Sequence, residues 1–252
     1  MLKKLWSVFV CLSFLLPACT AYGTENLPSM TRYDMAGETM HLSLPDGWYF
    51  NTPDQIDEEF LEVSENRAGR LKNYLDKNGI VFNLLSRDLS QEINIILKQN
   101  TQSKLLFNFS TMEESSLMEQ AELLISKENT PEGDKLSENS TYKSYELLKA
   151  DPFIFMVFEG DMITEDGSAD FVQYSTMVNG YALTMSMRTY DGGDFETSKT
   201  LMRQVVISLQ VDKILEFDRK SAMIAEFGPA VLLFFALILV VAFLIVRHLK
   251  KK

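Results

Sequence analysis

Few residues of this chain have side chains suited to catalysis, and His41 is the first to consider. It is one of two histidines, and the other, His248, lies in the basic C-terminal run. Met40, Leu42 and Leu44 alternate with the residues around them, which predicts a half-buried strand with His41 on its solvent face. A general base needs a positioned nucleophile and an orienting partner, and the spacing supplies neither. We therefore expect a solvent-facing histidine and no catalytic residue.

Sulfur and imidazole ligands for a metal are scarce as well. Cys11 and Cys19 are the only cysteines, and both lie in or beside the apolar N-terminal segment. The acidic part of the chain therefore has no disulfide, no thiol nucleophile and no ligand set for zinc. We expect neither a metal site of this kind nor a cofactor.

Calcium is the cation that the acidic turns could bind, because it takes oxygen ligands. Two glycine-containing turns carry the relevant residues, which are Asp161, Glu165, Asp166 and Asp170 around one and Asp191 and Asp194 around the other. The alternating spacing of an EF-hand is missing, and acidic residues are common in turns. The sequence favours turn chemistry and leaves calcium binding as an alternative.

Two further motifs have both a binding and a structural interpretation. Trp48, Tyr49 and Phe50 could form an aromatic recognition patch, but beside the first turn we expect them to pack in the core and at its edge. Asn108-Phe109-Ser110 and Asn139-Ser140-Thr141 match the glycosylation sequon, which matters only in a eukaryotic secretory pathway.

Charge is distributed unevenly along the 252 residues. All 35 acidic residues lie between Tyr22 and Phe227, together with only 18 of the 24 basic ones, so this region has 17 more acidic than basic residues. Such a field disfavours nucleic acid and anionic lipid headgroups. We interpret it mainly as a source of solubility, and we expect no nucleic-acid partner.

The strongest single signal is an uninterrupted apolar run at residues 228–246. As a helix, 19 residues extend about 28 Å, close to the roughly 30 Å hydrocarbon core of a bilayer. The basic residues at 247–252 should stay on the cytoplasmic side. The run therefore predicts a transmembrane helix with a cytoplasmic C-terminus and the acidic region outside the cell membrane.

The N-terminus agrees with this orientation. Lys3 and Lys4 precede an apolar stretch at 5–16, followed by Pro17 and small residues, which is typical of a secretory signal peptide. Cleavage after Ala21 or Gly23 is favoured over a lipoprotein cut before Cys19, because a proline inside the lipoprotein motif is awkward. We predict a signal peptide at 1–21.

Patterns between the two apolar segments predict both strands and helices. Strands are expected at 38–44, 48–50, 80–86, 92–98, 142–149, 153–163, 171–178 and 181–189. Helices are expected at 53–78 with a break, capped by Thr52, at 110–125, and after Asp194, which can serve as an N-cap. Strand pairs that need helices over an apolar face give an α+β fold, with an antiparallel sheet covered by helices.

The order of these motifs resembles that of PsbP-like domains. The run Leu42-Ser43-Leu44-Pro45-Asp46-Gly47-Trp48 is similar to their opening, and the run from Gln173 to Tyr181, followed by a strand, a helix and Val206-Ile207-Ser208-Leu209, is similar to their ending. The resemblance covers about residues 38–211 and implies an α/β/α sandwich. Such domains include an oxygen-evolving photosystem subunit, a Ran-binding import factor and bacterial envelope lipoproteins, and mostly bind or support partners. They generally lack a C-terminal span, and the resemblance carries over no ligand residues.

The expected organisation is therefore a signal peptide (1–21), a polar lead-in (22–36), a PsbP-like extracytoplasmic domain (37–211), a juxtamembrane connector (212–227), a transmembrane helix (228–246) and a basic cytoplasmic tail (247–252). The connector could be an amphipathic segment on the membrane or a solvated stalk. We expect a single-pass membrane protein whose non-enzymatic domain binds another envelope component. The alternatives are an envelope hydrolase with a carboxylate site and a calcium-dependent surface binding protein.

Overall fold

The structure is a computed structural model that describes residues 28–63, 68–129, 140–164 and 167–217. The expected signal peptide (1–21), transmembrane helix (228–246) and basic tail (247–252) lie outside the described residues. Among the residues that are described, no helix has the length and hydropathy that crossing a bilayer requires.

The elements follow one another along the chain as β1 (Met30–Met35), β2 (Met40–Pro45), β3 (Tyr49–Asn51), α2 (Glu58–Val63), α3 (Ala68–Asn78), β4 (Ile80–Leu85), β5 (Gln91–Lys98), α4 (Thr101–Leu106), the 3-10 helix η2 (Phe109–Thr111), α5 (Glu114–Glu128), β6 (Ser140–Ala150), β7 (Phe153–Thr164), β8 (Gly167–Val178), β9 (Tyr181–Tyr190), α6 (Phe195–Ile207) and β10 (Gln210–Val211).

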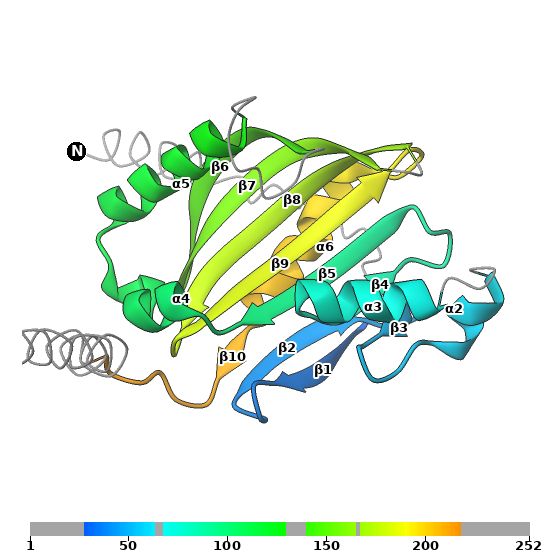
Figure 1. The fold of residues 1–252 in the computed structure, drawn as a ribbon, viewed down its shortest axis with the longest axis horizontal. Coiled ribbons are helices and arrows are strands. Elements are labelled where there is room, and N and C mark those ends of the chain that lie inside the picture. The colour runs from blue at the N-terminus through cyan, green and yellow to red at the C-terminus, as the bar shows by residue number, and fades with distance from the viewer. Residues whose placement is uncertain (1–27, 64–67, 130–139, 165–166, 218–252) are drawn as a thin grey trace, which may run out of the picture.

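Seven strands form one antiparallel sheet in the order β3-β4-β5-β9-β8-β7-β6 (Figure 1). Strands β6 to β9 are consecutive and pair in chain order, and β9 then pairs with β5, with Gln91 opposite Thr189 and Lys98 opposite Ala182. A smaller antiparallel sheet has the order β1-β2-β10. The fold is therefore α+β, with antiparallel sheets and a few helices, as the sequence predicted.

One face of the seven-stranded sheet packs against α6 and the three-stranded sheet, and we call it the α6 face. Helix α6 begins after Asp194, whose side chain accepts hydrogen bonds from the backbone N–H groups of Glu196 and Thr197, as expected for an N-cap. The main core lies between these layers. It includes Ile93, Ile95, Phe155, Val172, Leu183, Met185 and Met187 from the large sheet and Leu201, Met202, Val205 and Val206 from α6.

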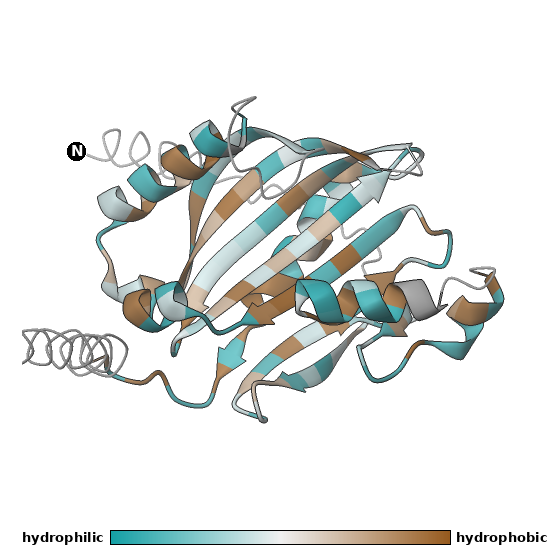
Figure 2. Ribbon diagram, viewed as in Figure 1, coloured by the Kyte–Doolittle hydropathy of each residue, from teal (hydrophilic) through white to brown (hydrophobic). Residues whose placement is uncertain are grey.

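The opposite face is only partly covered, and we call it the open face. At one edge α5 packs over β6 and β7, and at the other α3 contacts β4. Figure 1 shows the strands between these helices with no helix over them. A second apolar cluster lies under α5 and consists of Phe109, Leu117, Ala121, Met156 and Phe158. In Figure 2, apolar and polar residues alternate along the central strands, so each strand contributes to both faces.

Several helix boundaries differ from those expected. The helix predicted from residue 53 begins instead at Glu58, because Asp57, not Thr52, accepts hydrogen bonds from the backbone N–H groups of Glu59 and Phe60. Thr52 accepts from the backbone of Gln55 in a separate turn. The helix predicted from residue 110 begins at residue 114, after η2.

Four elements were not predicted, namely α4, η2, β1 and β10. Helix α4 forms where Asn100 and Ser103 make a reciprocal capping box. Strand β1 lies in the segment 22–36 that was expected to be a polar lead-in, and it pairs with β2 along its whole length.

Candidate functional site

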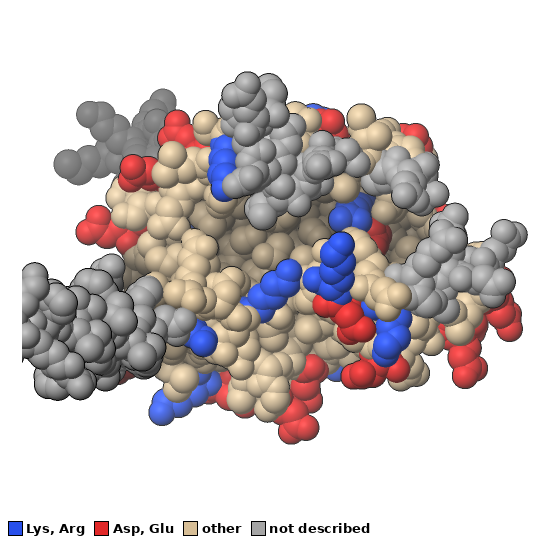
Figure 3. Space-filling model, viewed as in Figure 1, with Lys and Arg blue, Asp and Glu red and all other residues tan. Residues whose placement is uncertain are grey.

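A large cavity lies on the open face between α4 and α5, and we call it the apolar groove. Its volume is about 1190 Å³, and Leu105, Phe109, Met156 and Met177 are among the residues that line it. Figure 3 shows this face of the molecule hollowed near its centre. Pockets of this size lined by apolar side chains are typical of binding sites.

Local hydrogen bonds hold α4 at the rim of the groove. The Ser103 hydroxyl donates to the carbonyl of Gly180 at 2.7 Å, and the Gly180 N–H donates to the carbonyl of Phe107 at 3.1 Å. These bonds attach α4 to the turn between β8 and β9, the Asn179-Gly180 hairpin that the sequence predicted. Gly180 is needed here because its φ is +79° and an added Cβ would lie 3.2 Å from the Phe107 ring. Helix α4 at the rim of the groove and the β8–β9 hairpin therefore form one unit.

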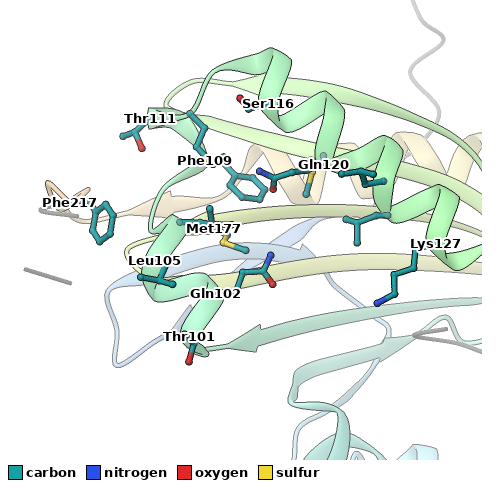
Figure 4. A pocket seen from close by; sticks show the side chains of 15 residues that line it. Thr101, Gln102, Leu105, Phe109, Thr111, Ser116, Gln120, Lys127, Met177 and Phe217 are labelled. Carbon is teal, nitrogen blue, oxygen red and sulfur yellow. The ribbon is translucent and has the colours of Figure 1, made fainter. Parts of the chain in front are cut away.

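The lining of the groove is almost free of charge. Of the described residues that line it, only Lys127 is charged, and the polar ones include the amides Gln102 and Gln120. Figure 4 shows Lys127 and Phe217 at opposite ends of the groove and Met177 between them. A groove lined mainly by apolar side chains suits the binding of an apolar ligand.

Apolar surface continues from the groove onto α5. Leu123 is 62% exposed, and Met118 and Leu124 are each 37% exposed, although all three are large and apolar. Leu123 and Leu124 line the groove, whereas Met118 does not. Exposed apolar surface such as that of Leu123 and Leu124 marks interaction sites in soluble domains. The helix was predicted from its apolar periodicity, but the sequence alone gave no sign of which apolar positions stay uncovered.

The first residues of the expected connector lie against the end of the groove. The Asn179 side chain accepts from the N–H of Leu215 at 2.8 Å and donates to the carbonyl of Lys213 at 2.8 Å. Asn108 donates to the carbonyl of Leu215 at 3.0 Å, and the Phe217 ring stacks on Phe107 with centroids 4.7 Å apart. Residues 212–217 are thus neither a stalk in solvent nor a helix, because two buried or half-buried asparagines bind their backbone. Residues 218–227 lie outside the described part of the chain.

A smaller cavity of about 360 Å³, the polar pocket, lies on the same face between α3 and β6. Its lining includes Asn94, Lys98 and Arg188. Below it, the Glu92 carboxylate accepts from Arg188 at 3.1 Å and from the Tyr190 hydroxyl at 2.8 Å.

Two pKa shifts follow from this contact. Burial lowers the pKa of Arg188, but the Glu92 carboxylate together with Tyr74 and Tyr190 outweighs this effect, so the pKa is raised. Burial and the same carboxylate raise the pKa of Tyr190. Arg188 is therefore a permanent cation at the edge of the pocket.

His41 is not solvent-facing as predicted: its residue is only 7% exposed. Nδ1 lies 2.6 Å from Asp34 and Nε2 lies 2.9 Å from Asp212. Hydrogen bonds to these two carboxylates raise the pKa of the imidazole. The prediction failed because β2 is the central strand of its sheet, so β1 and β10 flank the histidine. The geometry is that of an ion-pair cluster without a nucleophile.

Three acidic residues of the two turns, Asp161, Asp170 and Asp191, line one small pocket of about 180 Å³. Asp161 and Asp170 are opposite one another on β7 and β8, and both contact the Lys143 ammonium group, at 2.8 and 3.5 Å. Asp194 caps α6, and Asp191 accepts from Ser168 at 3.3 Å. Glu165 and Asp166 lie outside the described residues, and within the described ranges no three potential ligands are close enough to hold a metal ion.

The aromatic triplet packs as predicted. Tyr49 is buried against Phe60, and Phe50 stacks on Tyr33 with centroids 4.6 Å apart. Trp48 is half-buried against the main core. The triplet is therefore part of the core and its edge rather than a recognition patch.

The two sequons differ in what the structure says of them. Asn108 is 2% exposed and its amide is bonded to Leu215, so the folded protein leaves no room for a glycan there. Asn139 of the second sequon lies outside the described residues.

Comparison with known proteins gives a distant structural likeness. The chain is similar to the solution structure of cyanobacterial PsbP (CyanoP) from Synechocystis sp. PCC 6803, with a TM-score of 0.45, 15% identity, and coverage of 78% of this chain and 98% of that chain. A crystal structure from Bacteroides thetaiotaomicron has a TM-score of 0.40 and 13% identity, over 72% of this chain and 48% of that one.

No protein-family model matches the sequence, and no curated protein matches it. At such low identity and TM-score, the likeness carries no argument about activity or partners.

Proposed function

We propose that this chain is a non-enzymatic binding domain, exported and held at a membrane, whose apolar groove binds an apolar helical segment of another envelope protein. The observation that carries the proposal is the uncharged groove of about 1190 Å³ between α4 and α5. An amphipathic helix laid into such a groove would present apolar residues at i, i+3 and i+4.

Three features favour a polypeptide over a single lipid chain as the ligand. The groove volume exceeds the roughly 300–1,000 Å³ typical of small-molecule pockets. Leu123 and Leu124 line the groove and are still 62% and 37% exposed, so its apolar wall is accessible to a large ligand. The rim amides of Gln102 and Gln120 can pair with polar groups at the border of a helix.

The place of the groove in the chain supports the membrane part of the proposal. Phe217 lines its end, and the apolar run expected to span the bilayer begins at residue 228. The groove therefore opens within about ten residues of the expected membrane anchor, where helices of other membrane proteins are concentrated.

Site-specific photocrosslinking in native membranes tests this proposal. A photoreactive amino acid replaces Leu123 in the groove or, as control, Ile207 on α6, which is similarly exposed at 57%. We expect a defined protein adduct from position 123 and none from position 207. Leu105→Glu, which places a charge in the groove, should abolish the adduct, because burying that carboxylate is costly.

Three results would contradict the proposal. Equal adducts from both positions would indicate nonspecific contact, an adduct with the mass of a lipid would identify a different ligand, and an adduct unaffected by Leu105→Glu would place the partner elsewhere.

A further inference from the structure

A series of hydrogen-bonded amides ends at the polar pocket. The backbone N–H of Asp57 donates to Oδ1 of Asn51 at 3.0 Å, and Nδ2 of Asn51 donates to Oδ1 of Asn83 at 3.1 Å. Nδ2 of Asn83 then donates both to Glu92 at 2.7 Å and to Oδ1 of Asn94 at 2.9 Å. Each of these asparagines is buried.

The orientation of every amide in this series is fixed by its two ends. The backbone N–H of Asp57 can only donate, and the Glu92 carboxylate paired with Arg188 accepts. Asn94 must therefore turn its oxygen toward Asn83 and its NH₂ group away. That nitrogen is buried and has no hydrogen-bond partner among the described residues. A buried donor without a partner is rare in native proteins and needs an explanation.

The pocket beside Asn94 is lined by polar and basic side chains together with apolar ones, which include Ile96, Met162 and Phe171. Ser186 lies directly opposite it on β9, and Gln173 lies opposite Ser186 on β8. Lys98 and Arg188 also line the pocket. None of the described lining residues is acidic, although the region from Tyr22 to Phe227 has 17 more acidic than basic residues. Figure 3 shows basic side chains at the central hollow with an acidic group beside them, while most of the other acidic side chains lie toward the periphery.

We infer that the polar pocket binds a small organic carboxylate. Its volume of about 360 Å³ suits a small molecule. Glu92 already balances the charge of Arg188, so Lys98 supplies one uncompensated positive charge, which matches a monoanion. The hydroxyls of Thr184 and Ser186 are further donors.

Lys98 is exposed and makes the first contact with the ligand. The Asn94 nitrogen is covered, with less than 1 Å² of exposed surface. The Asn94 nitrogen can therefore donate a hydrogen bond to the ligand carboxylate only after neighbouring side chains move aside.

Calorimetric titration of the full-length chain tests the inference. The probes are acetate, lactate and glucuronate, each at millimolar concentrations, with their methyl esters as uncharged controls and inorganic phosphate as a second anion. We expect saturable binding of at least one carboxylate, none of its ester, and weaker binding of phosphate, whose second charge finds no partner.

Two variants locate the site. Lys98→Gln should weaken carboxylate binding about tenfold, as expected for loss of one charged hydrogen bond. Lys149→Gln, an exposed lysine paired with Glu114 on α5, is the control and should bind as the natural chain does. Asn94→Asp keeps the acceptor for Asn83 but replaces the unpaired donor with an oxygen, so it should abolish binding.

The inference is overturned if no probe gives a saturable signal, if an ester binds as tightly as its acid, or if the Lys98 and Lys149 variants bind equally. It is also independent of the apolar groove. Leu105→Glu should leave carboxylate binding unchanged even where it removes a protein adduct, so failure of one proposal is distinguishable from failure of the other.

Discussion

The two faces of the seven-stranded sheet are built from the same strands but differ in composition. Toward α6, neighbouring positions on β5, β9 and β8 are apolar and buried: Ile93, Met187 and Val172 follow one another across the sheet. One residue further along the strands, on the open face, the corresponding row is Asn94, Ser186 and Gln173.

This difference separates stability from binding. The α6 face is closed by a helix and a second sheet, so its side chains contribute the hydrophobic free energy of folding. The open face is covered only at its edges, so side chains at its centre contribute little to the hydrophobic free energy of folding. Cavities and unpaired polar groups can therefore occur there. The following variants test this separation, in order of decreasing expected effect.

The largest effect is expected from a truncation on the α6 face. Phe155→Ala removes a fully buried ring, and we expect it to lower the free energy of unfolding by about 3–5 kcal/mol. Met177→Ala, on the open face and half-buried in the groove, should cost about 1 kcal/mol, because less apolar area returns to water. Urea unfolding followed by the fluorescence of Trp48 measures both. Equal losses would show that both faces stabilise the fold alike.

The next effect concerns the ion pair of Arg188 and Glu92 under the polar pocket. Arg188→Met leaves the Glu92 carboxylate buried with only the Tyr190 hydroxyl and the Asn83 amide, and should cost about 2–3 kcal/mol. Adding Glu92→Gln should recover part of the loss, because the unpaired charge is then gone. A double-mutant cycle of urea unfolding measures the coupling. Additive effects of the two changes would mean that the pair is not coupled.

Much of the α6 face could be predicted from the sequence, because its signals are local. Alternating apolar residues predicted the strands, Asn179-Gly180 predicted a hairpin, and Asp194 predicted the start of α6. Each signal lies within a few residues of the element that it specifies, so neighbouring residues alone were enough.

The candidate site on the open face could not be predicted, because its parts meet only in the folded chain. Leu105 and Met177 line one groove although 72 residues separate them. The sequence around Asn108 shows a glycosylation motif but not its contact with Leu215. The unpaired nitrogen of Asn94 depends on contacts that begin at Asp57 and pass through three strands.

A smaller effect is expected at the end of the apolar groove. Asn179→Gly removes both side-chain hydrogen bonds to residues 213–215 and tolerates the φ of +53° at this position. We expect the free energy of local opening of this segment to fall by about 1 kcal/mol. Hydrogen exchange at the Leu215 amide should accelerate, while exchange at Met185 in the core should not. Acceleration at both amides would mean that the end of the groove and the α6 face open together.

The smallest effect is a pH dependence in the layer behind the α6 face. His41 has a raised pKa because Asp34 and Asp212 accept its hydrogen bonds. The positive charge of nearby Arg32 lowers this pKa, but by less than the two carboxylates raise it. A group whose pKa is raised by folding stabilises the fold below its unfolded pKa, about 6.5 for histidine, and loses this contribution as pH rises through the raised value.

We therefore expect the free energy of unfolding to decrease as pH rises from below about 6.5 through the raised pKa. His41→Gln cannot become protonated, so its stability should change less over the same range. Urea unfolding of both chains at a series of pH values measures this difference. Parallel pH profiles would show that the histidine between its two carboxylates contributes no charge-dependent stability, and that the polar groups coupled to folding lie under the open face instead.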